Sequence, residues 1–108
     1  ESSEGAANFE KILRTPGITA VFLGPVDLSV AMGLKGNVNA PEVRSALLTM
    51  VEQANRAGIP VGALGLDPAF VRELFSRGLN FLAYGIDTIL MYQKCCEIQQ
   101  AVFGRSAQ

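Results

Sequence analysis

Three short apolar runs, separated by longer stretches with helical periodicity, constrain the fold of this chain most. They lie at 18–23, 59–64 and 81–85. Short apolar runs bounded by glycine and proline are typical of buried β-strands. Strands that alternate with helices form right-handed βαβ units with parallel strands, buried on both faces. The sequence therefore predicts an α/β chain with parallel strands and flanking helices.

The helical stretches have recognisable ends. Proline in a first turn and glycine just past a last turn are typical helix boundaries. We expect helices over 6–14, from Pro41 to just before Gly58, from Pro68 (capped by Asp67) to just before Gly78, and from Asp87 or Thr88 as a cap to about Val102. The glycine-rich and asparagine-rich segment 25–40 is predicted to be a long loop with one helical turn at 28–32.

The length of the chain limits how much of an α/β fold it can hold. It has 108 residues, which suits one small domain over 1–108. Three parallel strands bury themselves poorly alone, and a closed (βα)8 barrel needs roughly 250 residues. We therefore expect the C-terminal three βα units of a (βα)8 TIM barrel, and we expect the chain to be a processed or excerpted piece because it begins with Glu1.

Composition excludes several classes of function. The net charge is −1, and the 9 basic residues are scattered, so nucleic acid is not an expected partner. No apolar run approaches the ~20 residues that span a bilayer, so we expect no membrane partner. The sequence has no histidine, which excludes a histidine zinc site or triad within the chain. Two adjacent cysteines, Cys95 and Cys96, cannot form a disulfide framework and favour a reducing, cytoplasmic compartment.

The segment Gly24-Pro25-Val26-Asp27-Leu28-Ser29 is the strongest candidate for a functional site. It follows the first predicted strand, and parallel α/β proteins build their sites at the carboxyl ends of strands. A carboxylate at that position is a candidate ligand for a hard metal ion. The alternative is that Asp27 merely caps the helical turn that follows.

These motifs resemble a known family over almost the whole chain. The segment 24–29 carries most of the resemblance, and further matches lie at 8–13, 16–18, 21–23, 32–33, 36–37, 41–43 and 83–88. The chain resembles the C-terminal part of class II, metal-dependent pyruvate aldolases of the HpcH/HpaI type, within the phosphoenolpyruvate/pyruvate barrel superfamily. Val26 departs from the family, which usually has a small residue such as alanine there.

The resemblance implies a metal site with two carboxylates. Glu1 matches the glutamate that ends the fifth strand in the family, and Asp27 matches the second ligand. An all-oxygen site of this kind suits Mg²⁺ or Mn²⁺, with Co²⁺ as a further candidate. The family's catalytic histidine and its substrate-binding arginine match no position here. The resemblance therefore implies no catalytic residue within this chain, and an isolated chain that is incomplete and inactive.

The implied reaction is that of a carbon–carbon lyase. In the family, a metal-stabilised pyruvate enolate reacts with an aldehyde to form 4-hydroxy-2-oxo acids, including 2-keto-3-deoxy sugar acids, or is released from them. Backbone N–H groups around Val26 and Asp27 would hold the substrate carboxylate. Leu64 and Ile86, near the ends of the other strands, would form apolar pocket wall. None of the three lysines ends a predicted strand, which argues against a Schiff base.

Two alternatives stay open. The chain could be a non-catalytic or split half-barrel that acts only with a partner chain, or another enolate-forming lyase of the same superfamily.

A further expectation concerns the last helix, whose apolar residues are spread around its circumference. Such a helix should be buried, and the family exchanges its final helix between neighbours, so we expect a homo-oligomer with this helix at a subunit interface.

Overall fold

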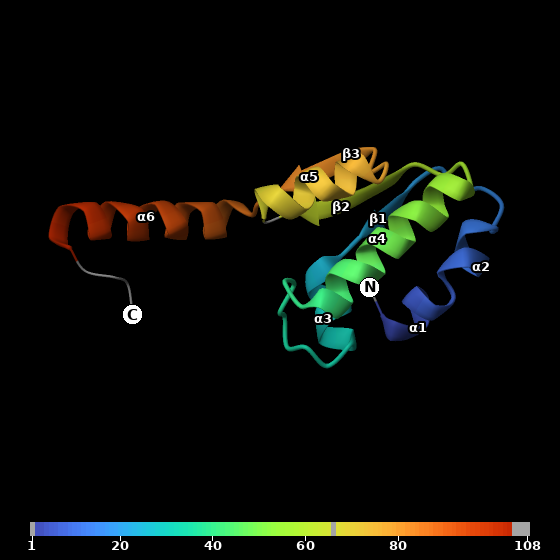
Figure 1. Cartoon of the computed structure of the whole chain (residues 1–108), viewed down its shortest axis with the longest axis horizontal. Coiled ribbons are helices and arrows are strands. Elements are labelled where there is room, and N and C mark those ends of the chain that lie inside the picture. Colours follow the sequence, from blue (N-terminus) through green and yellow to red (C-terminus); the bar gives the residue numbers. More distant parts are fainter. Residues whose placement is uncertain (1, 66, 105–108) are drawn as a thin grey trace.

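A computed structural model describes residues 2–65 and 67–104 (Figure 1). Six helices and three strands are assigned in these ranges, in the order α1 (Ser3–Ala7), α2 (Phe9–Leu13), β1 (Val21–Leu23), α3 (Pro25–Ala31), α4 (Pro41–Arg56), β2 (Val61–Gly65), α5 (Pro68–Ser76), β3 (Phe81–Tyr84) and α6 (Asp87–Phe103). The alternation of strands and helices predicted from the sequence is confirmed.

The three strands form one parallel sheet in the order β1-β2-β3. Leu23 of β1 is opposite Ala63 of β2, which in turn is opposite Leu82 of β3. The α/β class and the parallel pairing are therefore as predicted. The strands are shorter than expected at some ends: β1 begins at Val21 rather than at residue 18, and β2 begins at Val61 rather than at residue 59.

The two faces of the sheet have different environments. Helices α4 and α5 both pack against β2, and side chains of α4 such as Val43, Leu47 and Val51 are buried in one core with Val61 of β2. The alternate residues of the strands point the other way. There Phe22 and Phe81 are 46% and 40% exposed, and their ring centroids lie 6.0 Å apart across Gly62. One sheet face is thus covered, and the other is open.

The structure corrects two expectations near the N-terminus. The helix predicted over 6–14 is two short helices that meet at Asn8, whose backbone N–H and side-chain amide both donate to the carbonyl of Glu4. The segment after β1 is more helical than the single turn expected at 28–32, because α3 already begins at Pro25. Proline at the first helical position is pre-organised for a helix.

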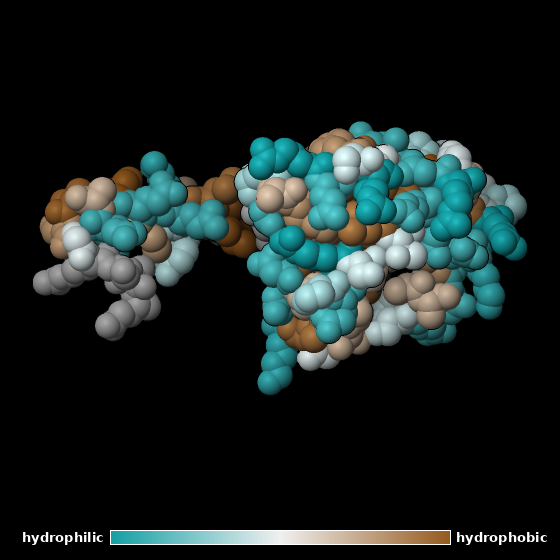
Figure 2. Space-filling model, viewed as in Figure 1, coloured by the Kyte–Doolittle hydropathy of each residue, from teal (hydrophilic) through white to brown (hydrophobic). Residues whose placement is uncertain are grey.

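The last helix has a different cap from the one predicted, and it is exposed in the single chain. Helix α6 has no buried residue along its length. It projects from the body of the molecule, which measures 55 × 27 × 21 Å (Figure 1). Its N-cap is Ile86, so neither Asp87 nor Thr88 is the cap. Its large apolar side chains are exposed, reaching 71% at Met91 and 70% at Phe103. Figure 2 shows hydrophobic and hydrophilic side chains mixed along it.

Within the described ranges, every helix is too short or too polar to cross a membrane.

Candidate site at the carboxyl edge of the sheet

The predicted site residues that the structure describes lie at one edge of the sheet. Asp27 follows β1 by four residues, Leu64 is the penultimate residue of β2, and Ile86 follows β3 by two. Because the three strands are parallel and paired in sequence order, their carboxyl ends lie at the same edge. Glu1, the other predicted metal ligand, lies outside the described residues.

Asp27 is placed by the way β1 passes into α3. Gly24 is the extended N-cap of α3 and Pro25 its first residue, so Asp27 is the third residue of the first turn. Because Gly24 is the N-cap, Asp27 is not the cap. Ser29 is buried, and its hydroxyl donates to the carbonyl of Val26 over 2.6 Å. This hydrogen bond helps to fix the same turn.

The carboxylate of Asp27 is exposed, and it has no hydrogen bond or ion pair with any other described residue. A negative charge in the first turn of a helix is favoured by the helix dipole. The N–H groups of Val26 and Asp27 belong to the same turn, where the helix itself offers them no acceptor. The turn therefore presents one carboxylate and two backbone donors at the edge of the sheet.

The donor chemistry of this turn fits part of a hard-metal site. An exposed carboxylate without a competing partner can bind Mg²⁺ or Mn²⁺, which take oxygen ligands. Within residues 2–65 and 67–104, however, no group of three or more histidine, cysteine or acidic side chains could hold a metal ion. Asp27 can therefore supply one ligand of such a site.

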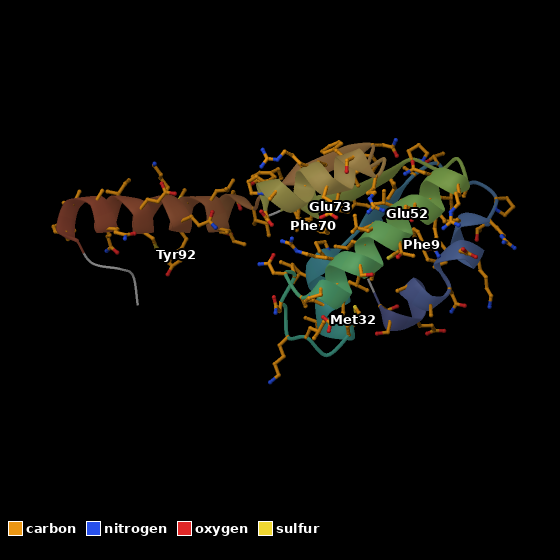
Figure 3. All side chains as sticks on the ribbon, in the orientation of Figure 1. Phe9, Met32, Glu52, Phe70, Glu73 and Tyr92 are labelled. Carbon is orange, nitrogen blue, oxygen red and sulfur yellow. The ribbon has the colours of Figure 1, made fainter. Side chains whose placement is uncertain are left out.

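Beside this turn lies a polar cluster that the sequence analysis did not single out. Nη2 of Arg44, in the first turn of α4, donates to Oδ1 of Asn39 over 2.9 Å and to Oδ2 of Asp67 over 2.5 Å. The guanidinium carbon lies 4.5 Å from the ring centroid of Phe70, a residue of α5 labelled in Figure 3. No sequence spacing links Arg44 to Asp67, because the two are 23 positions apart.

Asp67 has two roles in that cluster. It is the N-cap of α5, as predicted, and its Oδ1 accepts the N–H of Ala69 over 3.0 Å. The hydrogen bond from Arg44 and then that from Ala69 hold the pKa of Asp67 below its ordinary value. A lowered pKa means that the stabilisation from these contacts is present above the ordinary aspartate pKa and is lost as the pH falls through the lowered value.

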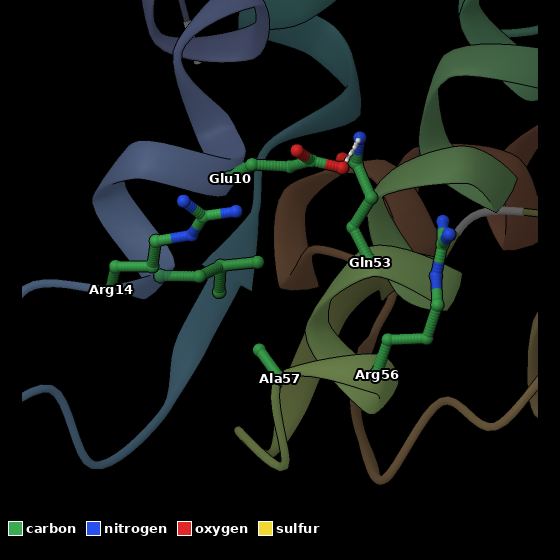
Figure 4. A pocket seen from close by; sticks show the side chains of 6 residues that line it. Glu10, Arg14, Gln53, Arg56 and Ala57 are labelled. Carbon is green, nitrogen blue, oxygen red and sulfur yellow. Dashed lines mark hydrogen bonds between the residues drawn. The ribbon is translucent and has the colours of Figure 1, made fainter.

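Two hollows lie at different ends of the molecule. At the carboxyl edge, a small depression of about 20 Å³ has room for about one water molecule. It is lined by Pro25, Val38, Asn39, Leu64, Gly65, Asp67 and Phe70. A hollow of about 480 Å³ lies between α2 and the last turn of α4, where Gln53 donates to Glu10 (Figure 4). It contains none of the predicted site residues.

Three parallel strands with their flanking helices, and an acidic turn after the first strand, define the class: part of an α/β barrel with its candidate site at the carboxyl edge of the sheet. The family model described as "HpcH/HpaI aldolase/citrate lyase" matches residues 1–93. The chain belongs to this family, and the resemblance noted from its motifs is confirmed.

Individual relatives agree with this family assignment. The chain is 38% identical over 98 residues to a hydroxypyruvate/pyruvate aldolase of Pseudomonas aeruginosa, covering 91% of this chain and 37% of that protein. It is 36% identical over 103 residues to a 2-keto-3-deoxy-L-rhamnonate aldolase of Salmonella paratyphi B, covering 95% of this chain and 38% of that protein. The chain thus spans little more than a third of the curated relatives it matches.

A solved structure supports the fold. A HpcH/HpaI aldolase/citrate lyase family protein from Burkholderia cenocepacia superposes with a TM-score of 0.82 at 28% sequence identity. The superposition covers 94% of this chain and 40% of that one. The three βα units therefore correspond to part of a TIM barrel, and the open sheet face with Phe22 and Phe81 is the face that points into the barrel in a closed sheet.

Proposed function

We propose that the protein carrying this chain is a metal-dependent aldolase, a carbon–carbon lyase that forms or cleaves 4-hydroxy-2-oxo acids with pyruvate and an aldehyde as the other reactants. The observation that carries the proposal is the family match over residues 1–93, together with two relatives named as aldolases. The exposed carboxylate of Asp27 at the carboxyl edge of the sheet agrees with it.

In this proposal the first turn of α3 holds the keto acid. Asp27 and Glu1 would bind Mg²⁺ or Mn²⁺, and the cation would stabilise the negative charge that develops on the keto oxygen when pyruvate loses a methyl proton. The N–H groups of Val26 and Asp27 would hold the substrate carboxylate, since the first turn of a helix favours anions. Leu64 and Ile86 would form apolar wall beside it.

The open sheet face supports a role within a larger barrel rather than for the three strands alone. Phe22 and Phe81 on that face are exposed, and parallel strands are normally covered on both faces. We propose that further strands complete the barrel and supply the acid–base group. For the substrate class we propose 2-keto-3-deoxy sugar acids, because one relative is named for 2-keto-3-deoxy-L-rhamnonate.

We also propose that α6 packs against another copy of the chain and that the protein acts in the cytoplasm. The support for the first is that α6 is apolar on several sides and buries nothing. The support for the second is that both cysteines are free. Cell fractionation that found the protein outside the cytoplasm would contradict the proposed location.

The function is tested by Asp27→Ala in the full-length gene product. We expect Mn²⁺-dependent cleavage of 2-keto-3-deoxy acids to fall by at least about 100-fold, because a ligand and its charge are lost. The thermal unfolding midpoint should change little, since the Asp27 side chain is exposed and the loss of its helix-dipole interaction costs about 0.3–1 kcal/mol. Glu73→Ala is the matched control, as Glu73 is an exposed carboxylate on α5, labelled in Figure 3. An Asp27→Ala variant with near-normal turnover would overturn the metal assignment.

A further inference from the structure

The contacts of Arg44 join two loops that are far apart in the sequence. One partner, Asn39, lies in the segment between α3 and α4, directly after the helix that bears Asp27. The other partner, Asp67, lies in the turn after β2, three residues beyond Leu64. Both loops leave the carboxyl edge of the sheet, where the candidate site lies. The guanidinium therefore links the loop that follows one site residue to the loop that follows another.

The link combines hydrogen bonds with a contact of the guanidinium on an aromatic ring. A single nitrogen, Nη2, donates to both loops, and the guanidinium carbon lies over the ring of Phe70. Lysine carries a more strongly hydrated point charge on a flexible stem and lacks the planar set of donors. Among hydrogen bonds between described residues, those of Arg44 are the ones that connect segment 32–40 with the turn at 67–70.

The loop on the Asn39 side has an irregular backbone. Asn37 accepts the N–H of Asn39 over 3.1 Å, which forms a local turn, and Lys35 has a positive φ of 51°. Residues other than glycine adopt that backbone conformation at a cost in free energy. The segment contains no regular secondary structure between α3 and α4. Contacts with the rest of the fold help to hold its position, and the side chain of Arg44 provides one of them through Asn39.

We propose that Arg44 is a positioning residue of the candidate active site. By holding Asn39 and Asp67 on one guanidinium, it fixes the spacing between the loop that follows Asp27 and the turn that follows Leu64. It touches neither substrate nor metal in this role. The consequence for catalysis rests on the proposed function, whereas the consequence for the two loops does not.

The test uses Arg44→Met in the full-length gene product, with Arg44→Lys as a milder variant. Arg56→Met is the matched control: Arg56 is an exposed arginine on the same helix, and its described hydrogen bond goes to the carbonyl of Glu52 in its own helix. Hydrogen exchange of the amides at 37–40 and at 67, 69 and 70 reports the two loops. Steady-state cleavage of a 2-keto-3-deoxy acid with Mn²⁺ reports the site.

For Arg44→Met we expect exchange to become at least about tenfold faster in both segments. We expect KM for the keto acid to rise at least about fivefold, with a smaller change in kcat. Arg44→Lys should fall between the wild type and Arg44→Met, and Arg56→Met should match the wild type. Asp67→Asn, which keeps an oxygen for the N–H of Ala69 but loses the charge, should accelerate exchange in the same two segments.

Each other outcome overturns the proposal or its premise. Exchange that stays within twofold of the wild type in Arg44→Met shows that Arg44 does not hold the loops. Faster exchange with unchanged KM and kcat shows that it holds them without serving the site. If the wild type itself lacks cleavage activity, the proposed function fails, and the exchange measurement alone decides whether Arg44 links the two loops.

Discussion

Helices α4 and α6 have nearly the same length, 16 and 17 residues, yet one is packed in the core and the other is exposed. α4 buries Val43, Leu47, Met50, Val51 and Ala54, and it forms the centre of the core. α6 buries nothing. The reason lies in the arrangement of the apolar residues: those of α4 recur at helical spacing on one side, whereas those of α6 lie on several sides.

The difference teaches that an apolar helix is not automatically a core helix. Apolar residues on one side of a helix can be buried by a single neighbouring surface, and the sheet of this chain supplies one. A helix that is apolar on several sides needs neighbours on several sides, and no residue of α6 is buried against the other described elements. Within the single chain α6 has no buried residue, and its burial against another copy remains a proposal.

The largest expected effect tests the packing of α4. Leu47→Ala should destabilise the folded state by about 2–5 kcal/mol, because Leu47 is 1% exposed and its removal leaves a cavity in the core. The same substitution on α6, Leu90→Ala, should cost less than about 1 kcal/mol, since Leu90 is half exposed. Urea unfolding of the full-length gene product measures both, and equal losses would break the comparison.

A smaller effect compares the ends of the two helices. Gly58 follows α4 with φ of 70°, and Gly104 follows α6 with φ of 62°. Alanine costs about 1–2 kcal/mol in this left-handed region. We expect Gly58→Ala to lower the stability of the sheet and its helices by that amount and Gly104→Ala to leave it unchanged, because α6 is not packed on them. Hydrogen exchange of the β2 amides distinguishes the two variants.

The smallest effect on unfolding is expected for a charge on α6. Ile98→Asp should change the unfolding free energy by no more than about 0.5 kcal/mol, because Ile98 is exposed and contributes nothing to the core. If α6 packs against another copy, the same variant should dissociate the assembly in sedimentation velocity. Lys94→Gln, an exposed position on the same helix, is the control. An assembly that tolerates Ile98→Asp would remove α6 from the interface.

Some residues of the candidate site could be found from local sequence patterns, and others only from tertiary contacts. Asp27 could be found from the sequence because it follows an apolar run and a Gly-Pro turn, both of which are local patterns. Asp67 could be predicted as a cap for the same reason. Its ion pair with Arg44 could not be predicted, because the partner is 23 positions away and no periodic pattern relates the two.

The sequence by itself determined the α/β class, the parallel pairing, most helix boundaries, the family, and the position of Asp27 at a strand end. All of these follow from hydrophobic periodicity, turn residues and motifs that act over a few positions. Only the tertiary structure decided that one sheet face is open, that α6 leaves the body, and that Arg44 joins two loops. These features depend on which surfaces meet, and packing between distant segments is not encoded in any short stretch of sequence.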